Sequence, residues 1–178
     1  MLGPLHIQYN QHGDPKYLER VADQVLNWPH VETGQPNVDR PTTIFVRLKE
    51  SATANEPAAF ITDREFGRIL LAAPTIYLAL PIMCAHWAIV RRWAEPHYLT
   101  SYGLMPTGTV VVYTPRDETE LEVCTFLFQE SYRFACKSLD RSLAQISSDD
   151  RRNVISMPQT RGAERFGERA VEYSVAGR

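Results

Sequence analysis

Apolar residues recur at helical spacing in two parts of the chain. The first predicted helix follows Asp14, which can cap it, and ends before Pro29. Its inward face consists of apolar residues three or four positions apart: Leu18, Val21, Ala22, Val25 and Leu26. The second follows Asp117, which has the spacing of a capping box with Glu120, and extends to Leu139. Its wide apolar stripe predicts a helix of the core.

Between these helices the pattern changes to short runs rich in β-branched and aromatic residues, which is typical of strands. Such runs occupy residues 42–47, 65–71, 75–80 and 108–113. An apolar helix is expected from residue 81 to about 93, and irregular connections over residues 32–41, 49–57 and 94–108. The order is therefore α-β-β-β-α-β-α. Because most links between strands are too short for parallel crossovers, this order predicts an α+β fold with a small, largely antiparallel sheet and helices packed on one face.

The recognisable pattern ends near residue 141. Residues 1–141 are expected to form a single domain, and residues 142–178 a C-terminal extension that is disordered or strapped over the domain. The apolar run of residues 69–90 is long enough to cross a bilayer. However, Pro74 and Pro81 divide it, and the segment between them has strand character. We therefore expect a buried strand followed by a buried helix, and no membrane span.

Composition and charge exclude some classes of function. The chain has 178 residues, of which 44% are hydrophobic and 22% charged, as in an ordinary globular domain. A net charge of −2 without a basic stripe argues against nucleic-acid binding. The cysteines, Cys84, Cys124 and Cys136, are odd in number and show no Cys-x-x-Cys spacing, which favours reduced thiols in an intracellular protein. The first residues do not resemble a signal peptide, so a cytoplasmic location is expected.

Motifs for a bound cofactor or metal are missing from the sequence. It contains no Gly-rich phosphate loop, no His-x-x-x-His helix and no paired-cysteine metal site. We therefore expect no metal, flavin or nicotinamide. His86 lies two positions from Cys84, but side chains two apart on a helix do not face each other, so a thiol nucleophile with its base is not expected there. The sequence makes no prediction of oligomeric state.

Three segments occur in an order and spacing that together suggest a family. The first is residues 65–70 (EFGRIL) followed by 75–80 (TIYLAL), the second is residues 93–97 (WAEPH), and the third is residues 113–120 (YTPRDETE) running into the long helix. Together, over about residues 58–135, they resemble the luciferase-like domain of the fungal bioluminescence enzyme and its bacterial relatives. The first segment is similar to the family's central strand pair, the second to the segment that ends its helix, and the third to its last strand and helix.

The chain departs from this family at its histidines. The family tends to have histidine at the positions of Arg68 and Leu70, and the fungal enzyme also at that of Tyr77. Positions 68 and 70 point to the same face of a strand, where two imidazoles can hold a metal, orient oxygen or transfer protons. This chain has none of these three histidines. Of the family-like histidines only His97 is present.

Arg68, Tyr77 and His97 are the candidate catalytic residues, because each can donate a hydrogen bond to a substrate. Each also has a structural interpretation. Arg68 can extend to the sheet edge and snorkel, since Glu65 lies on the opposite face of a regular strand and is a direct partner only if a bulge intervenes at Gly67. Tyr77 can be an ordinary strand tyrosine. His97 can be a surface histidine that is hydrogen-bonded locally.

The resemblance implies a pocket for a planar, lipophilic small molecule and no organic cofactor. The predicted substrate-binding residues are Phe66, Leu70, Trp87, Glu95, Tyr98 and Tyr113. The leading hypothesis is a cofactor-independent enzyme of specialised metabolism that cyclises or isomerises a lipophilic terpenoid or polyketide, for example by a Diels–Alder-type cycloaddition. One alternative is a luciferase-like, cofactor-free oxygenase that acts on a small aromatic substrate with His97 as base. The other is a non-catalytic small-molecule carrier.

Overall fold

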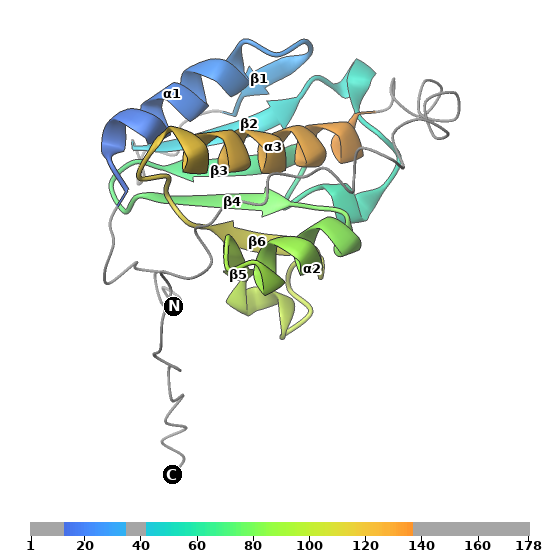
Figure 1. The fold of residues 1–178 in the computed structure, drawn as a ribbon. Helices are drawn as coiled ribbons and strands as arrows, with labels where there is room; N and C mark the ends of the chain where they lie inside the picture. The colour runs from blue at the N-terminus through green and yellow to red at the C-terminus, as the bar shows by residue number, and fades with distance from the viewer. Residues whose placement is uncertain (1–12, 35–41, 137–178) are drawn as a thin grey trace, which may run out of the picture.

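The computed structural model describes residues 13–34 and 42–136, which form a six-stranded sheet and three α-helices (Figure 1). The sheet order is β1-β2-β3-β4-β6-β5, and every neighbouring pair is antiparallel. The strands are β1 (Val31–Thr33), β2 (Thr43–Leu48), β3 (Glu65–Leu70), β4 (Thr75–Ala79), β5 (Ala94–Pro96) and β6 (Thr109–Val112). The predicted α+β class with an antiparallel sheet is confirmed.

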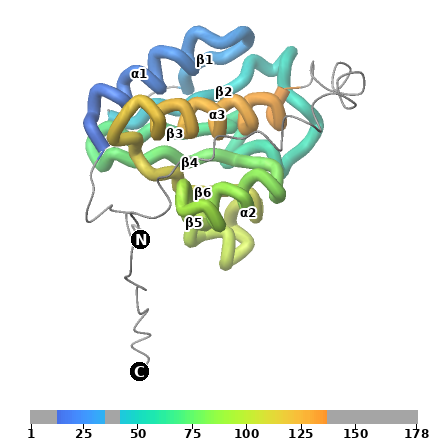
Figure 2. Tube along the Cα trace, viewed as in Figure 1, coloured from blue at the N-terminus to red at the C-terminus, as the bar shows by residue number. Residues whose placement is uncertain are grey.

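The α-helices are α1 (Pro15–Leu26), α2 (Ile82–Val90) and α3 (Glu118–Ala135). All three lie on one face of the sheet, with α1 and α3 side by side across its middle strands (Figures 1 and 2). The predicted caps are confirmed, because Asp14 accepts a hydrogen bond from the backbone N–H of Lys16, and Asp117 from that of Glu120. Three short 3₁₀-helices lie in the connections: η1 (Glu50–Ala52), η2 (Pro57–Ala59) and η3 (Tyr98–Thr100).

Two edge strands, β1 and β5, lie in segments that the sequence pattern assigned to irregular connections. β1 pairs with β2, and β5 pairs with β6. Each strand has only three residues, and β5 includes Pro96, so neither shows the apolar alternation by which a strand is recognised. The helix expected to end near residue 93 ends at Val90, since the chain enters β5 at Ala94. The predicted C-terminal extension, residues 142–178, lies outside the described residues.

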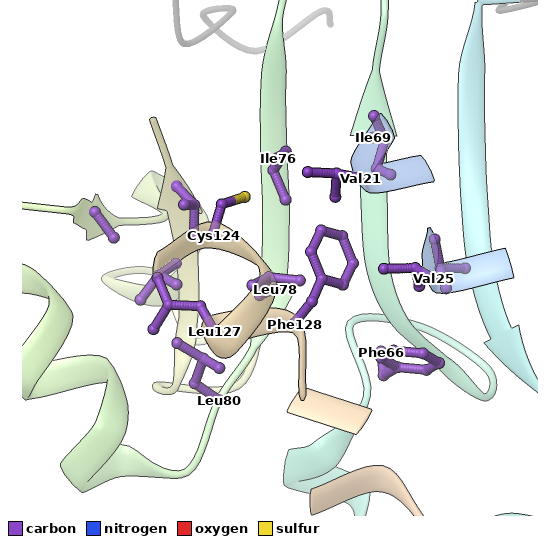
Figure 3. Packing of buried hydrophobic residues seen from close by; sticks show 14 of the residues in the cluster. Val21, Val25, Phe66, Ile69, Ile76, Leu78, Leu80, Cys124, Leu127 and Phe128 are labelled. Carbon is purple, nitrogen blue, oxygen red and sulfur yellow. The ribbon is translucent and has the colours of Figure 1, made fainter. Parts of the chain in front are cut away.

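The hydrophobic core fills the space between the helices and the sheet (Figure 3). Its largest fully buried side chains come from both the helix layer and the sheet, and they include Leu18, Val21, Val25, Phe66, Ile69, Ile76, Leu78, Leu127 and Phe128. Phe128 of α3 packs directly over Gly67 of β3, where a Cβ atom would lie 2.7 Å from the aromatic ring. Glycine at position 67 therefore allows α3 to approach the sheet closely. No helix of the described residues is long and apolar enough to cross a membrane.

A β-bulge interrupts the pairing of β2 with β3. Val46 pairs with Gly67, whereas the next residue, Arg47, pairs with Glu65, so Phe66 is an additional residue on β3. Both Phe66 and Gly67 face the helices. The bulge therefore places Glu65 on the face opposite to the helices.

Ser131 of α3 forms a hydrogen bond with the backbone of the bulge from the helix layer. Its hydroxyl is completely buried and lies 2.8 Å from the carbonyl oxygen of Phe66 and 2.7 Å from that of Ala79. A single hydroxyl proton is thus shared between backbone acceptors of β3 and β4. Because buried carbonyl groups need a donor, this contact stabilises the bulged geometry.

We expect the substitution Ser131→Ala to lower the free energy of unfolding by about 1–3 kcal/mol, because it leaves a buried carbonyl group without its donor. Chemical denaturation measures this loss. Ser101→Ala is the matched control, since the Ser101 hydroxyl also donates to a backbone carbonyl, that of Tyr98, but is exposed. A loss at Ser131 no larger than that at Ser101 would contradict the role of Ser131.

Candidate functional site

The face of the sheet opposite to the helices carries a continuous row of side chains. The strand register aligns one residue of each of five strands in this row: Phe45, Arg68, Tyr77, Val111 and Glu95. Residues paired directly across neighbouring strands extend to the same face, so these side chains are neighbours. We call this surface the helix-free face.

Arg68 is fixed in this row by a buried carboxylate. Its Nε donates to Oε1 of Glu65 at 2.6 Å, and its Nη2 donates to Oε2 at 2.8 Å, which is a forked, two-bond geometry. The Glu65 side chain is 3% exposed and that of Arg68 is 14% exposed. Thr62 donates its hydroxyl proton to Oε2 of Glu65 at 2.6 Å. Arg68 therefore does not extend to the sheet edge. The bulge that is needed to bring Glu65 to the same face as Arg68 occurs at Phe66, next to Gly67.

A groove of about 320 Å³ opens beside Arg68. Its volume lies in the range of small-molecule sites. The lining residues are Gly34, Phe45, Arg47, Thr62, Asp63, Glu65 and Arg68. Arg47 is paired with Asp63, so the groove contains two arginine–carboxylate pairs, and it is more polar than the lipophilic pocket expected from the sequence.

The Arg68 guanidinium is oriented on a second side by an aromatic ring. Its central carbon lies 4.9 Å from the centroid of the Phe45 ring, within the range of a cation–π contact. In the described residues, Glu65 engages two of the five N–H groups that an arginine carries. The guanidinium therefore lies at the groove with its orientation fixed and with donors remaining for a ligand.

Tyr77 and His97 are in direct contact on the same face. Their ring centroids are 4.8 Å apart in an edge-to-face arrangement, and the His97 ring stacks on Tyr98 at 4.9 Å. His97 is only 3% exposed, so it is not a surface histidine. Its Nδ1 accepts a hydrogen bond from the backbone N–H of Leu99 at 3.2 Å. Since Nδ1 is an acceptor, the neutral ring carries its proton on Nε2.

Thr109 is a buried polar residue of the helix-free face that sequence reasoning did not select. It is completely buried on β6, two positions from Val111 on the same face, and it pairs with Ala79. Its backbone carbonyl accepts a hydrogen bond from the N–H of His97, so the two residues are adjacent. Its hydroxyl is a buried polar group without a hydrogen-bond partner. Such a group is costly unless a ligand engages it, and only the folded structure can reveal it.

The remaining predicted binding residues divide between the two faces. Glu95 and Leu70 lie on the helix-free face, where Leu70 packs in a small apolar cluster with Tyr77 and Val111. Tyr98 joins them through its contact with His97.

The other three predicted binding residues do not lie with these. Phe66 is buried under α3, edge-on to Tyr132. Trp87 packs against Phe126 on the helix side. Tyr113 lines a separate cavity of about 20 Å³ near the start of α3.

Neither Cys84 nor Cys124 is an activated thiol, and the described residues contain no cluster of metal-ligating side chains. Burial raises the pKa of Cys84 to about 12, and that of Cys124 also to about 12, so neither forms a thiolate near neutral pH. Over residues 13–34 and 42–136, no cluster of three or more His, Cys, Asp or Glu side chains could hold a metal ion.

Residues 63–131 match the family model described as the luciferase domain. No curated protein and no solved structure matches the chain significantly. The matched range runs from β3 into α3, so it includes Glu65, Arg68, Tyr77, His97 and Thr109.

We expect the substitution Thr109→Val to raise the free energy of unfolding by about 1 kcal/mol, because it removes an unsatisfied buried hydroxyl without changing the side-chain shape. Thermal unfolding followed by circular dichroism measures the change. Thr114→Val is the matched control, and it should lower the free energy of unfolding, since the buried Thr114 hydroxyl donates to the carbonyl of Pro74 at 2.7 Å. Equal destabilisation of the two variants would contradict the absence of a hydrogen-bond partner for the Thr109 hydroxyl.

Proposed function

We propose, since the chain carries a luciferase-like domain over residues 63–131, that it is a cofactor-independent enzyme that cyclises or isomerises a lipophilic terpenoid or polyketide. A Diels–Alder-type cycloaddition is one such reaction. The proposal rests on one observation, the placement of Arg68, Tyr77 and His97 in one row on the helix-free face, with Tyr77 between the other two. A reaction of this type requires a bound geometry and a polarised carbonyl group, and no nucleophile.

In this proposal Arg68 polarises a carbonyl group of the substrate at the groove. Glu65 and the Phe45 ring fix the guanidinium before the substrate binds, so its donors need little reorganisation as charge develops on the carbonyl oxygen. Because the carboxylate balances the guanidinium, the site presents strong donors without burying a net charge. Tyr77 and His97 continue the row of side chains beyond the groove, which neither of them lines.

The two parts of the helix-free face suit different parts of one substrate. The groove beside Arg68 is polar, and we assign to it the oxygen-bearing end. The neighbouring cluster of Leu70, Tyr77 and Val111 is apolar and suits the lipophilic part. Met105 packs on this cluster, and its unbranched side chain can change rotamer to admit a ligand.

The tautomer of His97 favours this mechanism over the luciferase-like oxygenase. A general base needs a free lone pair, and on Nε2 this would require the proton on Nδ1. In the structure Nδ1 instead accepts the Leu99 N–H. His97 is therefore arranged as a donor and not as the base that direct oxygenation of a substrate would need.

A mass-balance assay separates the three candidate functions. The purified protein is incubated in air, without added cofactor, with a panel of polyene terpenoids and polyketides that carry a carbonyl group, and the products are identified by liquid chromatography and mass spectrometry. We expect a product isomeric with its substrate. A product heavier by one or two oxygen atoms would instead identify an oxygenase. Retention of an unchanged compound by the protein, without any product, would identify a carrier.

We expect the substitution Arg68→Met to lower kcat by about 10²–10³, because it removes the donor that acts on the developing charge. Substrate affinity should change far less, since the interaction strengthens mainly in the transition state. The single variant leaves Glu65 buried without its partner, which we expect to cost about 3 kcal/mol of stability. The double variant Glu65→Gln/Arg68→Met removes both charges and should recover most of that stability without recovering kcat.

Arg20→Met is the control for this series. Arg20 also forms an ion pair, with Glu118, but it is exposed and belongs to the helix layer. Its substitution should leave both kcat and stability nearly unchanged. If the double variant of Glu65 and Arg68 regained stability and kcat together, the pair would be structural and Arg68 would have no part in catalysis.

A further inference from the structure

Two arginines line the groove of the helix-free face, and the proposed function uses only Arg68. The second, Arg47, lies on β2 two residues from Phe45, which pairs with Arg68 of β3. Diagonal neighbours on an antiparallel pair are within reach of each other when their side chains are long. The register of β2 and β3 therefore brings two guanidinium groups to one groove.

Arg47 is fixed at the groove in the same manner as Arg68. Its Nε donates to the backbone carbonyl of Asp63 at 3.2 Å, and its Nη2 donates to the Asp63 carboxylate. Gly34 packs against the aliphatic part of Arg47, since a Cβ atom at position 34 would lie 2.9 Å from its Cδ. The Arg47 side chain is 23% exposed, whereas that of Asp63 is 73% exposed. The guanidinium thus lies at the groove, and its carboxylate partner lies toward solvent.

The hydrogen-bonding groups that remain in the groove are mainly donors. In the described part of the chain, Arg47 and Arg68 each donate through Nε and Nη2, so both retain the two N–H groups of Nη1. Neither Nη1 is a buried atom without a partner, so both are open to a ligand. Both oxygens of Glu65 already accept hydrogen bonds, from Arg68 and Thr62. A matching ligand therefore brings two acceptors, one for each arginine.

The charge balance of the groove favours neutral acceptors over an anion. Its charged lining residues are the two arginines and the two carboxylates of Asp63 and Glu65, so the lining carries no net charge. A phosphate or carboxylate ligand would lose its hydration and meet both carboxylates without an excess of positive charge. A carbonyl oxygen has no charge to desolvate, and it still gains a strong hydrogen bond from a charged donor.

We propose that the groove binds a β-dicarbonyl compound, with one carbonyl oxygen on Arg68 and the other on Arg47. In such a compound both oxygens can extend from the same edge of the molecule, as two arginines on one groove require. The inference rests on the proposed function for the role of Arg68, and it adds the substrate class and a second binding residue. A substrate with a single carbonyl group leaves one guanidinium without an acceptor, so the groove discriminates against it.

Binding of two aryl ketones to the full chain tests this proposal. The probes are benzoylacetone and butyrophenone, which differ by one carbonyl group, and calorimetric titration measures the Kd of each. We expect benzoylacetone to bind about tenfold more tightly, the effect of one hydrogen bond to a charged group. Arg47→Met should remove this preference, because it weakens the binding of benzoylacetone about tenfold and leaves that of butyrophenone nearly unchanged.

Arg64→Met is the matched control for Arg47→Met. Arg64 also forms an ion pair with Asp63, at 3.7 Å, but it does not line the groove. Its substitution should therefore keep the preference for benzoylacetone. Thermal melts verify that the variants fold. If Arg47→Met does not fold, Arg47→Met/Asp63→Asn removes both charges of the pair and applies the same comparison.

Three outcomes would overturn the proposal. The native protein binds the two ketones equally, or neither of them, or Arg47→Met keeps the preference for benzoylacetone. Tighter binding of hydrocinnamate, an anion of similar size, would also overturn it and assign the groove to a carboxylate. These failures are distinct from a failure of the proposed function, which needs one carbonyl group on Arg68 and is tested by product formation. Absence of an isomeric product would leave the binding preference at Arg47 intact.

Discussion

The forked ion pair between Glu65 and Arg68 depends on a single additional residue in β3. On a regular strand, residues three positions apart point to opposite faces, and the bulge at Phe66 brings these two to the same face. Without it, either the Glu65 carboxylate or the Arg68 guanidinium would enter the apolar layer under the helices, where an unpaired charge is strongly unfavourable. Ser131 satisfies the carbonyl group at the bulge from the helix side. The backbone at Phe66 and Gly67 therefore contacts the core on one face and sets the geometry of the Glu65–Arg68 ion pair on the other.

The two faces of the sheet carry different kinds of side chain. The helix side buries the large apolar side chains, and it makes the fold stable without disulfides. The other face carries a paired arginine, a tyrosine in contact with a histidine, and the unpartnered hydroxyl of Thr109. Polar groups placed in this way reduce stability or add little to it, so the helix side carries most of the stability of the fold.

The sequence by itself determined the α+β class, the four main strands, the helix caps at Asp14 and Asp117, and the family resemblance, because these follow from local periodicity and short motifs. It also selected Arg68, Tyr77 and His97; the structure pairs Arg68 with Tyr77 on neighbouring strands and places the ring of His97, which follows β5, against Tyr77. Only the tertiary structure decided the edge strands, since three-residue strands owe their existence to a partner. For the partner of Arg68, the sequence offered Glu65 only on condition of a bulge, and the register between β2 and β3 decided that the bulge occurs. The polar groove and the unpartnered hydroxyl of Thr109 could not be found from the sequence, because each depends on register and burial between segments far apart in the chain.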